Sequence, residues 1–147
     1  EKKFIYNAAK EFGSQCIVVS VDAKLVENEF YVFKNFGKMN SNIKVRDWLK
    51  IIQEEGAGEI LLNSIDNDGV MGGYDIDVLQ DVSKTTRVPI VALGGAGKLR
   101  DMTNIVSGVG ITAAAAGSLF IYHGKLKGIL INYPGFDEVQ LMIEGKK

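Results

Sequence analysis

Apolar positions recur along this chain with two different spacings, which predicts helices interleaved with strands. Residues 3–12 carry apolar side chains at helical spacing and end at Gly13, a natural helix stop. Later runs are apolar on both faces and rich in β-branched residues, as the buried strands of parallel sheets are. The pattern predicts strands at 16–21, 59–65, 89–93 and 112–116, and helices at 47–54, 75–83, 99–107 and 137–144.

An excursion separates the first predicted strand from the helix at 47–54. Its aromatic and β-branched residues 30–33 predict a short hairpin arm, and the polar stretch 35–42 predicts a loop. The aromatic side chains of the arm, together with Trp48, are expected to pack against neighbouring elements rather than to form a ligand cage.

The alternation of strands and helices implies right-handed crossovers and a parallel sheet, so the predicted fold class is α/β. Ligands of such folds bind in the loops at the carboxyl ends of the strands. A barrel and a doubly wound sheet both fit four strand and helix units. A complete (βα)₈ barrel needs about 250 residues, and the chain has 147. Half a barrel and a self-contained four-stranded domain both remain open, and unpaired sheet edges would favour association.

The composition excludes some classes of protein but does not indicate a specific function. The chain is 46% hydrophobic and 24% charged with a net charge of −1, which is typical of one soluble domain covering 1–147. This balance gives no electrostatic basis for binding nucleic acid or a membrane surface. No apolar run approaches the roughly 20 residues of a membrane span, and no signal peptide is visible, so a cytoplasmic location is expected. The single Cys16 is expected to be a buried thiol.

Small residues follow two adjacent predicted strands and indicate a phosphate site. The turn 94–97, with Gly94 and Gly95 at its start, lies between a strand and a helix, where backbone amides can converge on an anion. Gly117 and Ser118 end the next strand and offer a further amide and a hydroxyl. Many barrels bind phosphate with the loops after their last two strands. The turn matches neither the dinucleotide fingerprint nor a P-loop.

Acidic residues at other strand ends are candidates for acid or base chemistry. Asp22 follows an apolar strand, where it could be a general acid or base or simply a turn residue. Ser64, Asp66 and Asp68 raise the same question after the second strand. The stretch 66–69 resembles the start of a calcium loop, but the required glutamate is missing, and the lone His123 makes a zinc site improbable, so no metal is predicted.

Several motifs, in order and at matching spacing, resemble the cyclase subunit of imidazole glycerol phosphate synthase. They are Val21-Asp22-Ala23-Lys24, Gly56-Ala57-Gly58-Glu59-Ile60-Leu61-Leu62, Ser64-Ile65-Asp66, Asp68-Gly69, Gly73-Tyr74-Asp75 and Gly94-Gly95-Ala96-Gly97. The resemblance covers residues 12–122. It implies a TIM-type (βα)₈ barrel of two half-barrels, of which this chain would be the C-terminal (βα)₄ half. It also implies a glutaminase partner whose ammonia crosses the barrel, and no cofactor.

The resemblance assigns roles to individual residues. Asp22 matches a catalytic aspartate thought to act as general acid, and Ser64 and Asp68 match a loop that lines the substrate. Glu59 starts a buried strand at the opposite end, where a carboxylate needs a basic partner, and it matches a charged ring at the ammonia entrance. The residues expected to hold a substrate phosphate are Gly69, Gly94, Gly95, Gly117 and Ser118.

The departures from the family pattern leave the substrate open. Leu93 and Asn63 stand where the histidine-pathway enzymes carry serine and threonine, and Asn67 and Leu25 replace arginines. These features look like a paralogous branch that supplies ammonia to amidate surface-polysaccharide sugars, as in lipopolysaccharide biosynthesis. The half carrying the catalytic base is not in this chain, which alone is expected to show little cyclase activity. A non-catalytic phosphate-binding half-barrel, a homodimer that rebuilds the barrel, and a flavodoxin-like domain are the alternatives.

Overall fold

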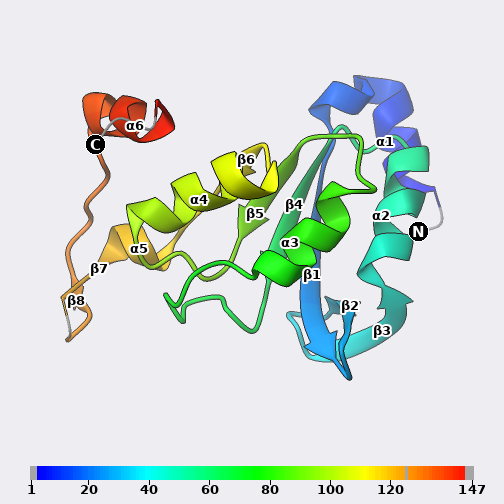
Figure 1. Ribbon diagram of the computed structural model, residues 1–147. Coiled ribbons are helices and arrows are strands. Elements are labelled where there is room, and N and C mark those ends of the chain that lie inside the picture. The colour runs from blue at the N-terminus through cyan, green and yellow to red at the C-terminus, as the bar shows by residue number, and fades with distance from the viewer. Residues whose placement is uncertain (1–2, 125, 145–147) are drawn as a thin grey trace.

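A curved six-stranded sheet runs through the computed structural model of the chain, which describes residues 3–124 and 126–144 (Figure 1). The strand order is β3-β2-β1-β4-β5-β6. Four strands are parallel, namely β1 (Val18–Val26), β4 (Glu59–Ser64), β5 (Ile90–Leu93) and β6 (Ala113–Ala114). Each lies beside the one before it in the chain. A doubly wound sheet reverses its order at a switch point, so this order is that of a barrel segment, and the predicted α/β fold is confirmed.

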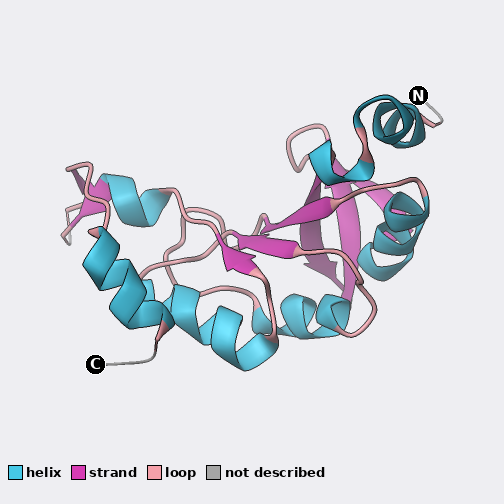
Figure 2. Cartoon of the chain, turned by 90° about the horizontal axis from the view of Figure 1, so that it is seen from above, coloured by secondary structure: helices cyan, strands magenta, loops and turns pink. Residues whose placement is uncertain are grey.

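Three helices connect the parallel strands and cover one face of the sheet. They are α2 (Val45–Glu54), α3 (Ile76–Ser83) and α4 (Leu99–Val109), and Figure 2 shows them along one side of the curved sheet. Alternate strand residues such as Ile60 and Leu62 are fully buried against Ile52 of α2 and Val82 of α3 in one core. Because strand side chains alternate between faces, the residues between them point to the opposite, uncovered face.

A hairpin extends the sheet beyond β1. Strands β2 (Glu29–Lys34) and β3 (Met39–Lys44) are antiparallel, and β2 pairs with β1 only from Asp22 to Val26. On that side, no strand in the described part of the chain pairs with β1 from Val18 to Val21. The predicted hairpin arm is confirmed. The predicted loop at 35–42 is wrong in its second half, because β3 forms by backbone pairing with β2 and needs no apolar pattern of its own.

The start of the chain differs from the prediction at one point. Helix α1 (Phe4–Phe12) ends at Gly13 as expected, but a 3₁₀ turn, η1 (Ser14–Cys16), follows before β1 begins. Cys16 is exposed in this turn, so the prediction of a buried thiol is wrong. The physical reason is that the hydrogen-bonded ladder between β1 and β4 begins only after Cys16. Pairing between β1 and β4 begins at Val18, and the residues before it lie outside the sheet.

The last part of the chain runs away from the sheet in Figure 1. The predicted strand at 112–116 is reduced to β6, a pair of alanines, which is consistent with the low strand preference of alanine. A short helix α5 (Ser118–Ile121) leads into a two-stranded ribbon of β7 (Tyr122–His123) and β8 (Gly128–Ile129). His123 is exposed there, as predicted for a surface residue. Helix α6 (Phe136–Ile143) ends the described chain.

Candidate active site at the carboxyl ends of the strands

A cleft of about 410 Å³ opens where the parallel ladder between β1 and β4 ends. Asp22 lies inside β1 rather than after it as predicted, because antiparallel pairing with β2 extends the strand to Val26. The lining of the cleft combines residues from both strands with the hairpin turn and with the loop after β4. The lining residues are Asp22, Lys24, Phe36, Gly37, Asn63, Ile65, Asp66 and Asp68. Three residues singled out from the sequence, Asp22, Asp66 and Asp68, therefore share one cleft at the end of the sheet where α/β folds bind ligands.

Asp22 is held in this cleft by a partner on the next strand. It pairs in register with Asn63 of β4, and the Asn63 Nδ2 donates a hydrogen bond of 3.1 Å to the Asp22 Oδ1. Both side chains are half-buried on the face that the helices leave uncovered. Asp22 is therefore a positioned carboxylate rather than a free turn residue.

The cleft carries more acidic than basic groups. Three of its lining residues are aspartates, and its single lysine, Lys24, forms an ion pair of 2.8 Å with the Asp66 carboxylate. The Lys24 ammonium also lies over the Phe33 ring, 5.8 Å from its centroid. Both contacts fix the lysine beside Asp22, two residues along the same strand. Neither Lys24 nor Phe36 was predicted as a site residue, because the hairpin that brings them together is a tertiary feature.

Ser64 takes a different place from the one expected. It is the last residue of β4 and is buried, with 6% of its surface exposed. Its hydroxyl lies 3.4 Å from the Asp75 Oδ2 as donor, and the Asp75 carboxylate also accepts from the Val78 amide at the start of α3. Ser64 is therefore not among the residues that line the cleft, and its expected role on the substrate loop stays a prediction. Its side chain faces the helices and supports the N-cap of α3.

The glycine-rich turn after β5 packs tightly against the loop after β4. The Gly73 amide donates to the Gly95 carbonyl at 2.8 Å. A Cβ on Gly95 would overlap the Gly73 carbonyl, and one on Gly97 would overlap that of Met71. The expected anion site is partly occupied by the chain itself, because the Gly97 and Lys98 amides both donate to the Asp101 carboxylate at 3.0 and 2.9 Å.

The segment after β6 completes this group of loops. A Cβ on Gly69 would lie 3.9 Å from the Ser118 Oγ, so the loops after β4 and β6 are in contact range. The Tyr74 hydroxyl donates to the Ala115 carbonyl at 2.7 Å and joins the same two segments. The five residues predicted to hold a phosphate therefore lie in loops that meet around residues 66–74.

The matching family is described as histidine biosynthesis protein, and its match covers residues 1–127. The chain belongs to this family. It is 47% identical over 116 residues to the imidazole glycerol phosphate synthase subunit HisF of Sulfolobus acidocaldarius, covering 79% of this chain and 46% of that protein. The HisF subunit of Thermotoga sp. strain RQ2 matches with the same identity and coverage. That of Natranaerobius thermophilus is 42% identical over 131 residues, or 89% and 52%. The chain spans about half the length of these relatives.

Two further expectations concern the other end of the family fold. Glu59 begins β4, at the end of the strand opposite the cleft, as predicted. The basic partner expected for it is absent from the described residues, and its half-buried position explains why it needs none. The described residues contain no group of histidine, cysteine and acidic side chains that could hold a metal ion. None of the helices described is both long and apolar enough to cross a membrane.

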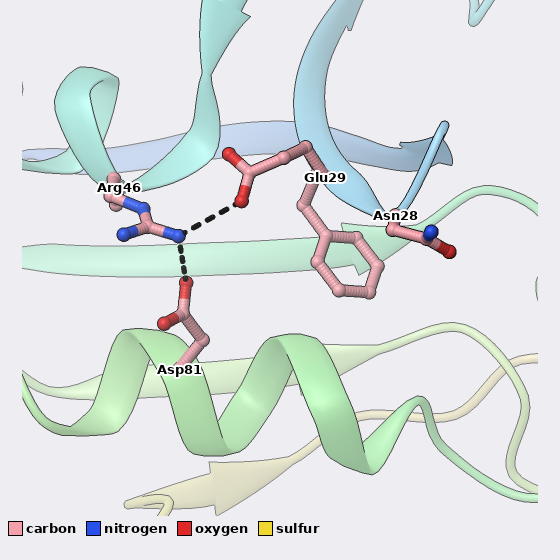
Figure 3. A pocket seen from close by; sticks show the side chains of 5 residues that line it. Asn28, Glu29, Arg46 and Asp81 are labelled. Carbon is pink, nitrogen blue, oxygen red and sulfur yellow. Dashed lines mark hydrogen bonds and ion pairs between the residues drawn. The ribbon is translucent and has the colours of Figure 1, made fainter.

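A second, smaller cavity of about 190 Å³ lies where the hairpin meets α2 and α3 (Figure 3). Arg46 is at its centre, with its Nη2 at 3.1 Å from the Glu29 Oε1 and 3.8 Å from the Asp81 Oδ2. Lys44 also pairs with Glu29 at 2.6 Å, and this hydrogen bond lowers the pKa of Glu29 and raises that of Lys44. These charged groups pair with one another, so the ion pairs connect the hairpin to α2 and α3.

Tyr74 provides a pH-dependent test of the contact between the loops. Burial raises the pKa of its phenol to about 12, from 10.0 for a free tyrosine. The neutral phenol is thus favoured in the folded state, so its contribution to stability is complete below pH 10 and is lost as pH rises toward 12. We expect the urea midpoint to fall between pH 10 and 12, and this fall to shrink in Tyr74→Phe. At pH 8 that variant should lose about 1 kcal/mol. An identical alkaline decline in both proteins would contradict this assignment.

Phe36 is the most unusual residue at the cleft. Its side chain is 97% exposed, and its φ of 58° places a bulky residue in the left-handed region. The backbone strain there costs about 1 kcal/mol and no packing offsets it. Asparagine adopts this left-handed conformation more readily than phenylalanine. We therefore expect Phe36→Asn to raise the free energy of unfolding by about 0.5–1 kcal/mol. The neighbouring Lys38→Asn is the control and should change nothing in a urea titration. Destabilisation by Phe36→Asn would show that the ring has a structural contact.

Proposed function

We propose that this chain, as a single domain spanning 1–147, is the C-terminal half-barrel of an ammonia-dependent cyclase of the imidazole glycerol phosphate synthase type. The observation that carries the proposal is Asp22, held by Asn63 at the mouth of a cleft. Membership of the histidine biosynthesis family and the sequential parallel strand order support it. The names of the relatives support the reaction type, and the half-length matches support the half-barrel.

In this proposal the residues of the cleft divide the chemistry between them. Asp22 is the general acid, which gives a proton to the substrate as the imidazole ring closes. Asp68 lines the cleft beside it. The substrate phosphate lies at the glycine loops, where Gly69, Gly94, Gly95, Gly117 and Ser118 allow close backbone approach. Ammonia arrives from the opposite end of the sheet, where Glu59 begins β4.

The other half of the active site belongs to a second half-barrel. We propose that an N-terminal half pairs its last strand with the free part of β1, and that a glutaminase supplies ammonia at the Glu59 end. A second copy of this chain is the alternative occupant. Light scattering with a phosphate titration tests this choice. A dimer of about twice 16.0 kDa supports self-association, and a monomer at all phosphate concentrations removes it.

The decisive experiment is turnover by the full-length protein. We expect it to use ammonium salts to convert the ribulosyl-formimino carboxamide ribotide into imidazole glycerol phosphate and the aminoimidazole carboxamide ribotide. This chain alone should show no turnover, because the proposed catalytic base lies in the other half. Full activity of this chain alone would overturn the division of roles. Phosphate protection from unfolding without any turnover of the full-length protein would favour a non-catalytic phosphate-binding module.

A second candidate function rests on two side chains. Leu93, which ends β5 just before the glycine turn, has no hydroxyl to offer a phosphate, and Asn63 contacts Asp22 in the cleft. These residues favour the paralogous branch, in which the ammonia serves to amidate a surface-polysaccharide sugar. Rescue of a histidine auxotroph by the full-length protein would decide for the histidine pathway. Failure to rescue, with ammonia use intact, would decide for the paralogue.

A further inference from the structure

The Asn63 side chain uses only one of its two polar ends. Its Nδ2 donates to the Asp22 carboxylate, while its Oδ1 is buried and has no hydrogen-bond partner in the described part of the chain. A buried acceptor without a partner has lost its hydrogen bonds to water and gained none in return, which is unfavourable. Such a group in a folded protein calls for an explanation.

The atoms around the Asn63 Oδ1 explain why it has no hydrogen-bond donor. A Cβ on Gly94 would lie 2.9 Å from the Asn63 Oδ1 and 2.5 Å from the Ser64 carbonyl oxygen, so both acceptors border the small space left by this glycine. The Ser64 carbonyl already accepts from the Asn67 and Asp68 amides and offers no proton. An amide N–H in this space would face an acceptor, the Ser64 carbonyl oxygen, whereas the Asn63 amide oxygen faces another oxygen. The Asn63 nitrogen instead faces Asp22, whose carboxylate oxygen accepts its hydrogen bond.

We propose that Asn63 is a positioning residue that serves both protonation states of Asp22 by rotating its amide through half a turn. With Asp22 ionised, the Asn63 Nδ2 donates to the carboxylate. Once Asp22 carries a proton, the carboxylic acid donates to the Asn63 Oδ1, and the Nδ2 turns toward the space beside Gly94. This role rests on the proposed function, in which Asp22 takes up and releases a proton at a fixed position. Glycine at position 94 leaves room for both orientations.

Other charged groups near Asp22 have to be separated from this effect. On the same strand, Lys24 points into the cleft and is paired with Asp66. From the loop after β4, Asp66 and Asp68 line the same cleft. The strand on the other side contributes the uncharged Phe33, which pairs with Asp22 in the ladder. Among the described residues, Asp22 is the only side chain hydrogen-bonded to the Asn63 amide group, so its proton should reverse the amide.

Nuclear magnetic resonance on this chain tests the proposal without any turnover. The Asn63 side-chain NH₂ signals are assigned by their disappearance in Asn63→Thr. At pH 7 they should show a nuclear Overhauser contact to Asp22. As pH falls, they should shift with the same midpoint as the Asp22 carboxyl carbon and gain a contact to the Gly94 α-protons. Exposed Asn104 of α4 should not shift in this range.

A variant with an uncharged side chain at position 22 tests the same rotation of the Asn63 amide at neutral pH. In Asp22→Leu at pH 7, which offers the Asn63 Nδ2 no acceptor, the Asn63 signals should already show the Gly94 contact, and their shift with pH should be lost. The matched variant Asp66→Leu, in the same cleft, should keep the wild-type response. An Asn63 amide that keeps its orientation in Asp22→Leu, or that follows Asp66 instead, overturns the proposal. The outcome is separate from the proposed cyclase function, since inactive full-length protein with a rotating Asn63 would reject only the latter.

Discussion

Replacing Gly95 with alanine is expected to destabilise the chain by about 2–5 kcal/mol. Two independent effects add at this position. The φ of 111° is one that a residue with a side chain rarely adopts, and the new Cβ would overlap the Gly73 carbonyl oxygen. The atoms that the Cβ would meet belong to the backbone, so no flexible side chain can move to relieve the overlap. A urea titration followed by circular dichroism measures the loss.

Gly117→Ala is the matched control for this variant. Gly117 belongs to the same group of loops, but its φ is −112° and a Cβ there would meet no atom within 4 Å. It should change the free energy of unfolding by less than about 0.5 kcal/mol, as other open surface sites do. If the two alanine variants unfold at the same urea concentration, the close packing of the glycine turn against residues 71–73 is not a source of stability.

Asp22→Asn in the full-length protein is expected to lower kcat by roughly 10²–10⁴-fold, the usual contribution of a positioned general acid. The change keeps the shape of the side chain but removes its charge and its ability to release a proton, so kcat should fall far more than KM changes. Asp47→Asn, in the exposed first turn of α2, is the control and should keep full turnover. A variant that retains wild-type kcat would remove Asp22 from the mechanism while leaving the fold intact.

The main elements of the fold could be predicted from the sequence because their signals are local. The apolar run at 59–65 and the helix stop at Gly13 depend only on neighbouring residues, and both were confirmed. Strand β3 could not be predicted, since its residues Met39–Lys44 are mostly polar and their pairing with β2 supplies the order. Cys16 was misplaced because an apolar run does not reveal where the ladder with the next strand begins.

The candidate site was predictable only in part for the same reason. The strand ends, and the family resemblance, indicated Asp22 and the glycine loops. The partner of Asp22 lies 41 residues away on β4, and only the register between two strands brings the side chains together. Ser64 shows the converse. Its neighbour Asn63 points to the cleft while Ser64 points to the helices, and a period of two residues assigns faces only once one of them is known.

The short free stretch of β1 bears on the tendency of the chain to aggregate. Val18 is 55% exposed, and unpaired strand edges of this kind recruit other chains into growing sheets. The hairpin limits this growth, because β2 occupies β1 from Asp22 onward and leaves only Val18–Val21 available. Fibril-forming segments are typically six or seven residues long, so this edge is too short to seed one. It can still accept a single short strand, which favours a finite complex over an open-ended polymer.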